Sequence, residues 1–205
     1  MSHPRPKEKT LRKKGDFGVY HRATPVASKE IRAFVKNMFT NAFTSLPFNS
    51  DDELRVLDVG CGLGFLSCVS AEFYTNARIT GIDTFKHASL KGSSLKKAKE
   101  NAEILGFSDR IDFKMGDVFT FTPAGNFDLI VSNLVFHNFG KRRFDAYERL
   151  ARWATQKSYV ILGDLFFDYE SDLRSLSRVF ANINERPSST MGRQYRILVM
   201  SKNRP

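Results

Sequence analysis

The chain has 205 residues, which suffices for one compact α/β domain with a full core and leaves little room for a second. It contains no run of about 18 apolar residues, so no membrane-spanning helix is expected. No apolar stretch follows the basic N-terminus as a secretory signal would require, and we expect a cytoplasmic protein. The two cysteines, Cys61 and Cys68, have no zinc-type spacing, so no metal or redox role is expected.

The formal net charge of +10 is partly carried by a basic N-terminal segment. The only acidic residue in this segment is Glu8, whereas its basic residues are Arg5, Lys7, Lys9, Arg12, Lys13 and Lys14. Such a tail is typical either of a nucleic-acid or membrane-surface contact or of a solvated leader, and both interpretations stay open. We assign residues 1–27 to this tail and residues 28–205 to a single domain.

After the tail, the hydrophobic spacing predicts elements that alternate along the chain. Residues 28–45 form the first amphipathic helix, with Ser28 as its N-cap. Strands are then predicted at 54–59, 78–82, 111–115, 127–132 and 159–163. The helices predicted after the first one are 67–74, 94–105 and 142–153, and Gly106 ends the second of these.

The C-terminal part departs from this alternation. A helix at 169–180 is followed by extended segments at 182–186 and 194–201, with Pro187, Ser188, Ser189 and Gly192 between them. This pattern predicts an antiparallel hairpin at the edge of the sheet. The whole order predicts an α/β, Rossmann-like, seven-stranded and mostly parallel sheet, with an antiparallel C-terminal hairpin and helices on both faces.

A glycine-rich turn follows the first predicted strand. Gly60, Gly62 and Gly64 let the backbone approach a ligand closely, and the next helix offers free N–H groups at its start. A dinucleotide-binding loop needs a small residue at the position that Phe65 occupies, so the spacing is GxGxG and not GxGxxG.

The turn resembles motif I of class I S-adenosylmethionine-dependent methyltransferases, and the resemblance extends over residues 55–163. It implies S-adenosylmethionine as the cofactor. In that family the loop, here including Cys61, cradles the amino-acid and sulfonium end of the cofactor. Asp58, at the end of the first strand, would orient the loop.

Two further acidic residues stand at predicted strand ends where the family has them. The resemblance implies that Asp83 accepts both ribose hydroxyls, and that Asp117 accepts the adenine amino group while Val118 donates through its backbone. Ligands of open parallel sheets bind at these carboxyl ends. Each carboxylate taken alone could simply cap a helix.

The turn after the fourth strand is expected to form one wall of the acceptor pocket. Asn133-Leu134 resembles the turn of adenine N6 methyltransferases, although Val135 stands where they have proline. Asn133 with His137 better resembles the Asn-x-x-x-His turn of small-molecule methyltransferases. His137 is our candidate base, and the alternative is a histidine that only lines the pocket. We assign Asn133 to both the cofactor and the acceptor.

Other segments carry weaker indications. Tyr20 and His21 are candidates for a lid over the cofactor, as in relatives. Lys141, Arg142 and Arg143 are either a solvated helix start, which we favour, or a contact for an anionic acceptor. Residues 85–102 resemble a bacterial and archaeal branch of the superfamily.

Three hypotheses for the function follow. The first is methyl transfer to a small-molecule acceptor, with Asn133 and His137 facing the acceptor. The second keeps the chemistry but takes RNA as the partner, through the basic tail and the Asn133-Leu134 turn. The third is a cofactor-binding or regulatory protein without catalysis. The oligomeric state is not predicted.

Overall fold

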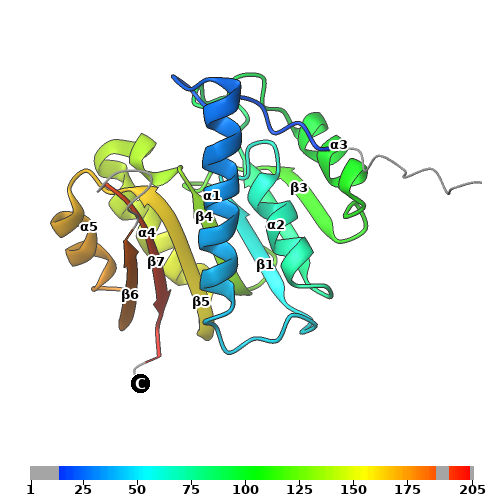
Figure 1. The fold of residues 1–205 in the computed structure, drawn as a ribbon. Coiled ribbons are helices and arrows are strands. Elements are labelled where there is room, and N and C mark those ends of the chain that lie inside the picture. The colour runs from blue at the N-terminus through cyan, green and yellow to red at the C-terminus, as the bar shows by residue number, and fades with distance from the viewer. Residues whose placement is uncertain (1–13, 188–193, 204–205) are drawn as a thin grey trace, which may run out of the picture.

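The computed structural model describes residues 14–187 and 194–203, which form a sheet flanked by helices (Figure 1). The strands in chain order are β1 Arg55–Val59, β2 Arg78–Asp83, β3 Ile111–Met115, β4 Phe127–Asn133, β5 Ala154–Leu165, β6 Asn182–Pro187 and β7 Tyr195–Ser201. The helices are α1 Pro25–Phe43, α2 Phe65–Phe73, α3 Leu95–Leu105, the 3₁₀ helix η1 Phe136–Arg142, α4 Arg143–Trp153 and α5 Tyr169–Leu176.

The sheet has the predicted topology. Its seven strands run in the order β3-β2-β1-β4-β5-β7-β6. Strands β1 to β5 pair in parallel, whereas β7 is antiparallel to both β5 and β6. Because β1 has β2 on one side and β4 on the other, the strand order reverses at β1, and a crevice opens there at the carboxyl ends.

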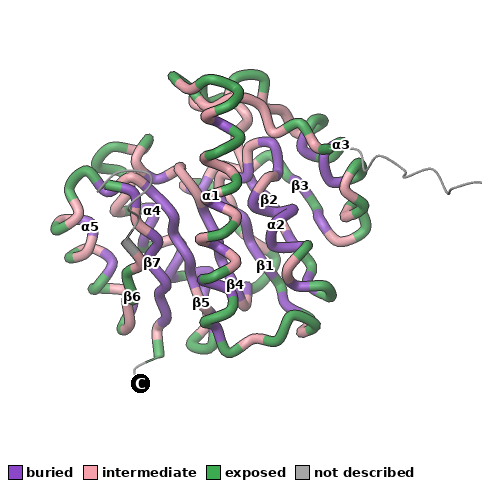
Figure 2. The backbone as a smooth tube through the Cα atoms, viewed as in Figure 1, coloured by how far each residue is buried: buried purple, intermediate pink, exposed green. Residues whose placement is uncertain are grey.

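Helices cover both faces of the sheet, and each face has its own core (Figure 2). On one face α1, α2 and α3 pack on the sheet, with Phe39 and Phe43 fully buried. On the other face α4 and α5 bury Tyr147 and Leu176. The helices α1 and α2 cross the near side of the sheet in Figure 1. The predicted two-sided covering is confirmed.

The start of the first helix was predicted wrongly. Helix α1 begins at Pro25, and the Thr24 hydroxyl accepts a hydrogen bond from the amide of Ala27 at 3.1 Å. Proline suits the first helical turn because its missing N–H would have no intrahelical partner there. The predicted cap, Ser28, is instead buried inside the helix and accepts a hydrogen bond from the amide of Tyr20.

The third and fourth helices both match their predictions closely. Ser94 caps α3, and Gly106 ends it with a φ of 78°. The helix predicted at 142–153 is α4, and the unpredicted η1 directly precedes it; Gly140 interrupts η1 with φ 55° and ψ −133°. The 3₁₀ turn re-aims the chain directly after β4, where the acceptor wall was expected.

Strand β5 is longer than predicted because it begins at Ala154, which pairs with Phe127 across an irregularity in the register. The helix predicted at 169–180 ends at Leu176 in the structure. The antiparallel hairpin of β6 and β7 is confirmed. Most of its predicted turn, residues 188–193, lies outside the described residues. Within residues 14–187 and 194–203, no helix is both long and apolar enough to span a membrane.

Candidate functional site

A cavity of about 820 Å³ opens at the carboxyl ends of the parallel strands, and we call it the main cavity. Nine of the ten predicted site residues line it, namely Asp58, Gly60, Cys61, Gly62, Asp83, Asp117, Val118, Asn133 and His137. The tenth, Gly64, lies at the N-cap of α2. Residues predicted from four separate strand ends are thus brought to one cavity.

The loop between β1 and α2 requires glycine at two points for steric reasons. Gly60 has a φ of 74°, and a Cβ there would lie 2.3 Å from a methyl carbon of Val135. Gly64 has a φ of 81°, and its Cβ would lie 2.5 Å from the ring of Phe113. Gly64 therefore serves helix packing, whereas Gly60 presents bare backbone to the main cavity.

The acidic residues of the cavity also hold their own loops. The Asp83 carboxylate accepts hydrogen bonds from the amides of Gly62 at 2.9 Å and Phe85 at 2.5 Å. The Asp117 carboxylate accepts one from the amide of Phe119 at 2.9 Å. Both side chains remain half-buried and line the cavity, so each can still bond the hydroxyl or amino groups of a ligand.

Asp58 is 1 % exposed and accepts a hydrogen bond from the Ser67 hydroxyl at 2.6 Å. Burial raises its pKa from 3.8 to about 7, and the nearby Asp83 carboxylate adds to this, while the Ser67 hydroxyl opposes it. A ligand carrying a cationic amino group near Asp58 would reverse the shift, because an opposite charge favours the carboxylate.

We expect Asp58→Asn to stabilise the ligand-free protein at pH 8. The folded state binds the Asp58 proton more tightly than the unfolded chain does, so wild-type stability falls as the pH rises from about 4 to about 7. Urea denaturation at pH 4 and pH 8 measures the difference. The variant should gain over wild type at pH 8 and lose that gain at pH 4. An equal difference at both pH values would contradict this.

The turn after β4 places His137 on the wall of the main cavity. Its Nδ1 atom lies 2.5 Å from a carboxylate oxygen of Asp164, which is 2 % exposed at the end of β5. The other oxygen of Asp164 accepts the amide of Phe136 at 2.7 Å. Asp164 thus fixes both the ring and the backbone of the turn, and Nε2 is the ring nitrogen left for a ligand.

Asn133 is held from the neighbouring strand. Its side-chain oxygen accepts a hydrogen bond from the Tyr195 hydroxyl at 2.8 Å. Both side chains lie next to Gly163 of β5. A Cβ at Gly163 would lie 2.5 Å from that hydroxyl oxygen, so glycine is needed there. The next residue, Leu134, has a φ of 57°, a conformation that costs a non-glycine residue free energy. The turn is therefore strained and tightly positioned.

Tyr20 and His21 also line the main cavity. Tyr20 forms an isolated antiparallel bridge with Leu90, and the amide of His21 donates to the carbonyl of Ser89 at 2.8 Å. The segment before α1 is thereby joined to the segment after β2 at the cavity. Whether these residues act as a lid stays a prediction.

The predicted basic cluster is divided between two hollows. Arg142 lies over the Phe119 ring, 3.8 Å from its centroid, beside the main cavity. Lys141 and Arg143 line a separate groove, described below, where Arg143 pairs with Asp172. The three cations therefore do not form one anion site.

Sequence reasoning missed Asp164 and Phe167. Asp164 directly follows the predicted strand 159–163, so the strand-end rule that selected Asp83 would also have selected it. Phe167 is 64 % exposed, lines the main cavity, and its ring lies 6.3 Å from that of His137. An exposed aromatic ring at this place carries no signal in the sequence.

The strand order, the glycine loop after β1 and the carboxylates at the ends of β2 and β3 together define the class I methyltransferase fold. A family model described as a methyltransferase domain matches residues 50–197. The chain therefore belongs to the methyltransferase domain family, within the class I methyltransferase superfamily.

Individual relatives divide between two kinds of acceptor. Trans-aconitate 2-methyltransferase of Streptomyces avermitilis is 37% identical over 95 residues, which is 46% of this chain and 33% of that protein. The tRNA1(Val) (adenine(37)-N6)-methyltransferase of Vibrio campbellii is 29% identical over 98 residues, 48% of this chain and 38% of that protein. The chain thus covers only about a third of the length of these relatives.

A solved structure of a putative O-methyltransferase from Nostoc punctiforme has the same fold. Its TM-score is 0.68 at 18% identity, over 93% of this chain and 65% of that one. At this identity, the likeness concerns the fold alone.

Proposed function

We propose that the protein transfers the methyl group of S-adenosylmethionine to a nucleophilic atom of a small-molecule acceptor. The observation that carries this proposal is His137 on the wall of the main cavity, held by the buried carboxylate of Asp164. A histidine ring oriented by a buried carboxylate is suited to accept a proton from an acceptor hydroxyl or similar group.

The main cavity fits the cofactor on physical grounds. The backbone at Gly60 is bare because Val135 fills the space of any Cβ, and the carboxylates of Asp83 and Asp117 offer acceptors to ribose hydroxyls and an adenine amino group. Asp58 would balance the cationic amino group of the cofactor. S-adenosylmethionine supplies an electrophilic methyl group on a sulfonium sulfur.

The residues of this chain would then align the acceptor and take up its proton. Asn133 and Leu134 form the rigid wall that positions the acceptor atom, and Phe167 contacts it from the β5 side. Nε2 of His137 accepts the proton as the new bond to the methyl carbon forms, and Asp164 stabilises the resulting imidazolium. The electron pair of the carbon–sulfur bond leaves with the sulfur.

RNA adenine methylation is the second candidate, supported by the Asn133-Leu134 turn and by similarity to the tRNA-modifying relative. The hydrogen bond between the Tyr195 hydroxyl and the side chain of Asn133 weighs against this second candidate. Adenine N6 methylation requires acceptors for the amino hydrogens, and the Tyr195 hydroxyl occupies one of the two lone pairs of the Asn133 oxygen. One lone pair and the amide nitrogen, a donor, remain, so fewer acceptor positions are left for an adenine amino group.

The test uses S-adenosylmethionine carrying a labelled methyl group, purified protein, and lysate separated into small-molecule, RNA and protein fractions. We expect label in the small-molecule fraction, and its loss with His137→Ala. Label in RNA would favour the second candidate. Cofactor binding without label in any fraction would favour the non-catalytic alternative.

A further inference from the structure

A second hollow lies beside the main cavity, between α4 and α5, and we call it the α4–α5 groove. Its volume is about 740 Å³. His137, Leu165 and Phe167 line both the groove and the main cavity. A molecule whose reacting atom lies at His137 could therefore extend into the adjoining groove.

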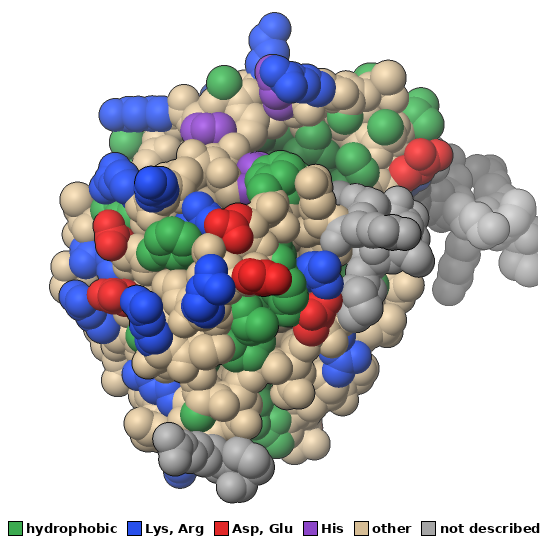
Figure 3. Space-filling view, turned by 90° about the vertical axis from the view of Figure 1, so that its left-hand side faces the viewer, with side chains coloured by type: hydrophobic (Ala, Val, Ile, Leu, Met, Phe, Trp, Pro, Cys, Tyr) green, Lys and Arg blue, Asp and Glu red, His purple; other side chains and the backbone are tan. Residues whose placement is uncertain are grey.

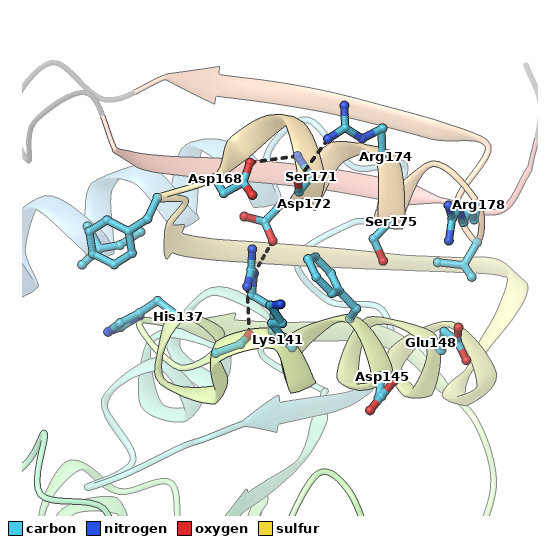
Figure 4. Close-up of a pocket in the computed structure, with 16 residues that line it drawn as sticks. His137, Lys141, Asp145, Glu148, Asp168, Ser171, Asp172, Arg174, Ser175 and Arg178 are labelled. Carbon is cyan, nitrogen blue, oxygen red and sulfur yellow. Dashed lines mark hydrogen bonds and ion pairs between the residues drawn. The ribbon is translucent and has the colours of Figure 1, made fainter.

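The groove is elongated. Figure 4 shows His137 at one end and Arg178 at the other, with Lys141 and Ser175 between them. It follows α5, whose 8 residues extend about 12 Å along the helix axis. Apolar side chains of Phe144, Leu165, Phe167 and Val179 lie along the same groove. Its length suits a chain-like molecule with an apolar middle.

The acidic residues of the groove are mostly satisfied within the protein. The carboxylate of Asp172 accepts hydrogen bonds from Arg143 and from the Tyr147 hydroxyl. Asp168 caps α5 through the amide of Ser171, and Glu148 pairs with Arg152. Asp145 points away from α5 in Figure 4.

The basic residues are less well satisfied. Lys141 and Arg178 have no hydrogen-bond or ion-pair partner within the part of the chain that the structure describes. Arg174 contacts the Ser171 hydroxyl at 3.0 Å and lies 4.0 Å from Glu170. Basic and acidic side chains are interspersed on this side of the molecule (Figure 3), and both kinds line the groove. Because Asp145 points away from α5, the unpaired charges that lie along α5, among the residues that the structure describes, are those of Lys141 and Arg178.

We propose that the α4–α5 groove binds a distal anionic group, a carboxylate or a phosphate, of an elongated acceptor. The proposal rests on the proposed function, because it places the methylated end of that acceptor at His137. Arg178, at the end away from His137, donates to the anion, Lys141 adds positive charge along the groove, and Leu165 and Phe167 contact the apolar chain between the two ends.

The test compares three probes of equal chain length on the full chain in the presence of S-adenosylhomocysteine. They are ω-hydroxydecanoate, ω-hydroxydecyl phosphate and the uncharged decanediol. We expect one of the anions to bind about tenfold more tightly than the diol, the scale of a charge-assisted hydrogen bond. Its titration should shift the backbone amide NMR signals of Ser171, Ser175 and Arg178. The tighter anion identifies the group as carboxylate or phosphate.

Charge-removing variants give the matched controls. Lys141→Gln and Arg178→Gln should each reduce the preference for the anion, and the double variant should abolish it. Lys99→Gln, on exposed α3 at the other end of the sheet, should leave it unchanged. Equal affinity for the diol and both anions, or a preference that survives the double variant, would overturn the proposal.

Failure of this inference can be told apart from failure of the proposed function. If the wild type does not bind S-adenosylmethionine, the proposed function fails. If it binds the cofactor and labels a small-molecule fraction while the anion preference is absent, only the groove assignment fails.

Discussion

Asp83→Asn is expected to weaken binding of S-adenosylmethionine by about a hundredfold. The variant keeps the shape of the side chain but loses the charge that would accept two ribose hydroxyls. Each hydrogen bond to a charged group contributes about 1.5 to 3 kcal/mol. Losing most of this contribution for one ribose hydroxyl and part of it for the other corresponds to an affinity about a hundredfold lower. Asparagine also offers an N–H group where either Gly62 or Phe85 needs an acceptor.

Isothermal titration calorimetry with S-adenosylmethionine measures this effect. Asp112→Asn, an exposed carboxylate on β3 that pairs with Lys114, is the matched control and should bind as the wild type does. The thermal unfolding temperature of each variant shows whether the loop has collapsed. Affinity within twofold of wild type in a folded Asp83→Asn protein would remove Asp83 from the cofactor site.

The second large effect is expected at Asp164. Asp164→Asn should lower kcat by on the order of a hundredfold while the Kd of S-adenosylmethionine changes little. Oriented general bases contribute about 10²- to 10⁴-fold to rates, and Asp164 both orients the His137 ring and stabilises its protonated form. Asp164 lies at the end of β5, away from the carboxylates proposed to hold the cofactor.

Two comparisons separate this role from a merely structural one. Asp109→Asn removes an exposed carboxylate before β3, at the edge of the sheet opposite the main cavity, and should leave kcat within about threefold, the range expected for a surface group. Added imidazole should restore part of the activity of His137→Ala, because a free base can enter the space left by the ring. Absence of rescue together with an unchanged kcat in Asp164→Asn would show that the pair does not act on the proton.

The fold was largely predictable because buried parallel strands and the helices between them have strong local patterns. The α3 helix is one example, since Ser94 and Gly106 mark its ends in the sequence as in the structure. The start of α1 was misread because Ser28 and Thr24 are both good caps. The Ser28 hydroxyl accepts a hydrogen bond from the amide of Tyr20, eight residues before it, whereas the Thr24 hydroxyl caps the helix. The break at Gly140 was not foreseen either.

The part of the main cavity proposed to bind the cofactor was easier to predict than the part proposed to bind the acceptor. Gly60, Asp83 and Asp117 stand within two residues of the ends of predicted strands, so their place at one edge of the sheet follows from parallel pairing. The acceptor wall depends on contacts between β4, β5 and β7, such as that of Asn133 with Tyr195, which are 62 residues apart. No local pattern encodes such a contact.

The sequence by itself determined the class I methyltransferase fold, the glycine loop and the acidic strand ends, because backbone conformation and hydrophobic periodicity are local properties. Only the tertiary structure decided that Asp164 holds His137, that Arg142 separates from Lys141 and Arg143, and that a groove between α4 and α5 adjoins the main cavity. These features depend on how distant segments pack, and side-chain partners and hollows exist only once that packing is complete.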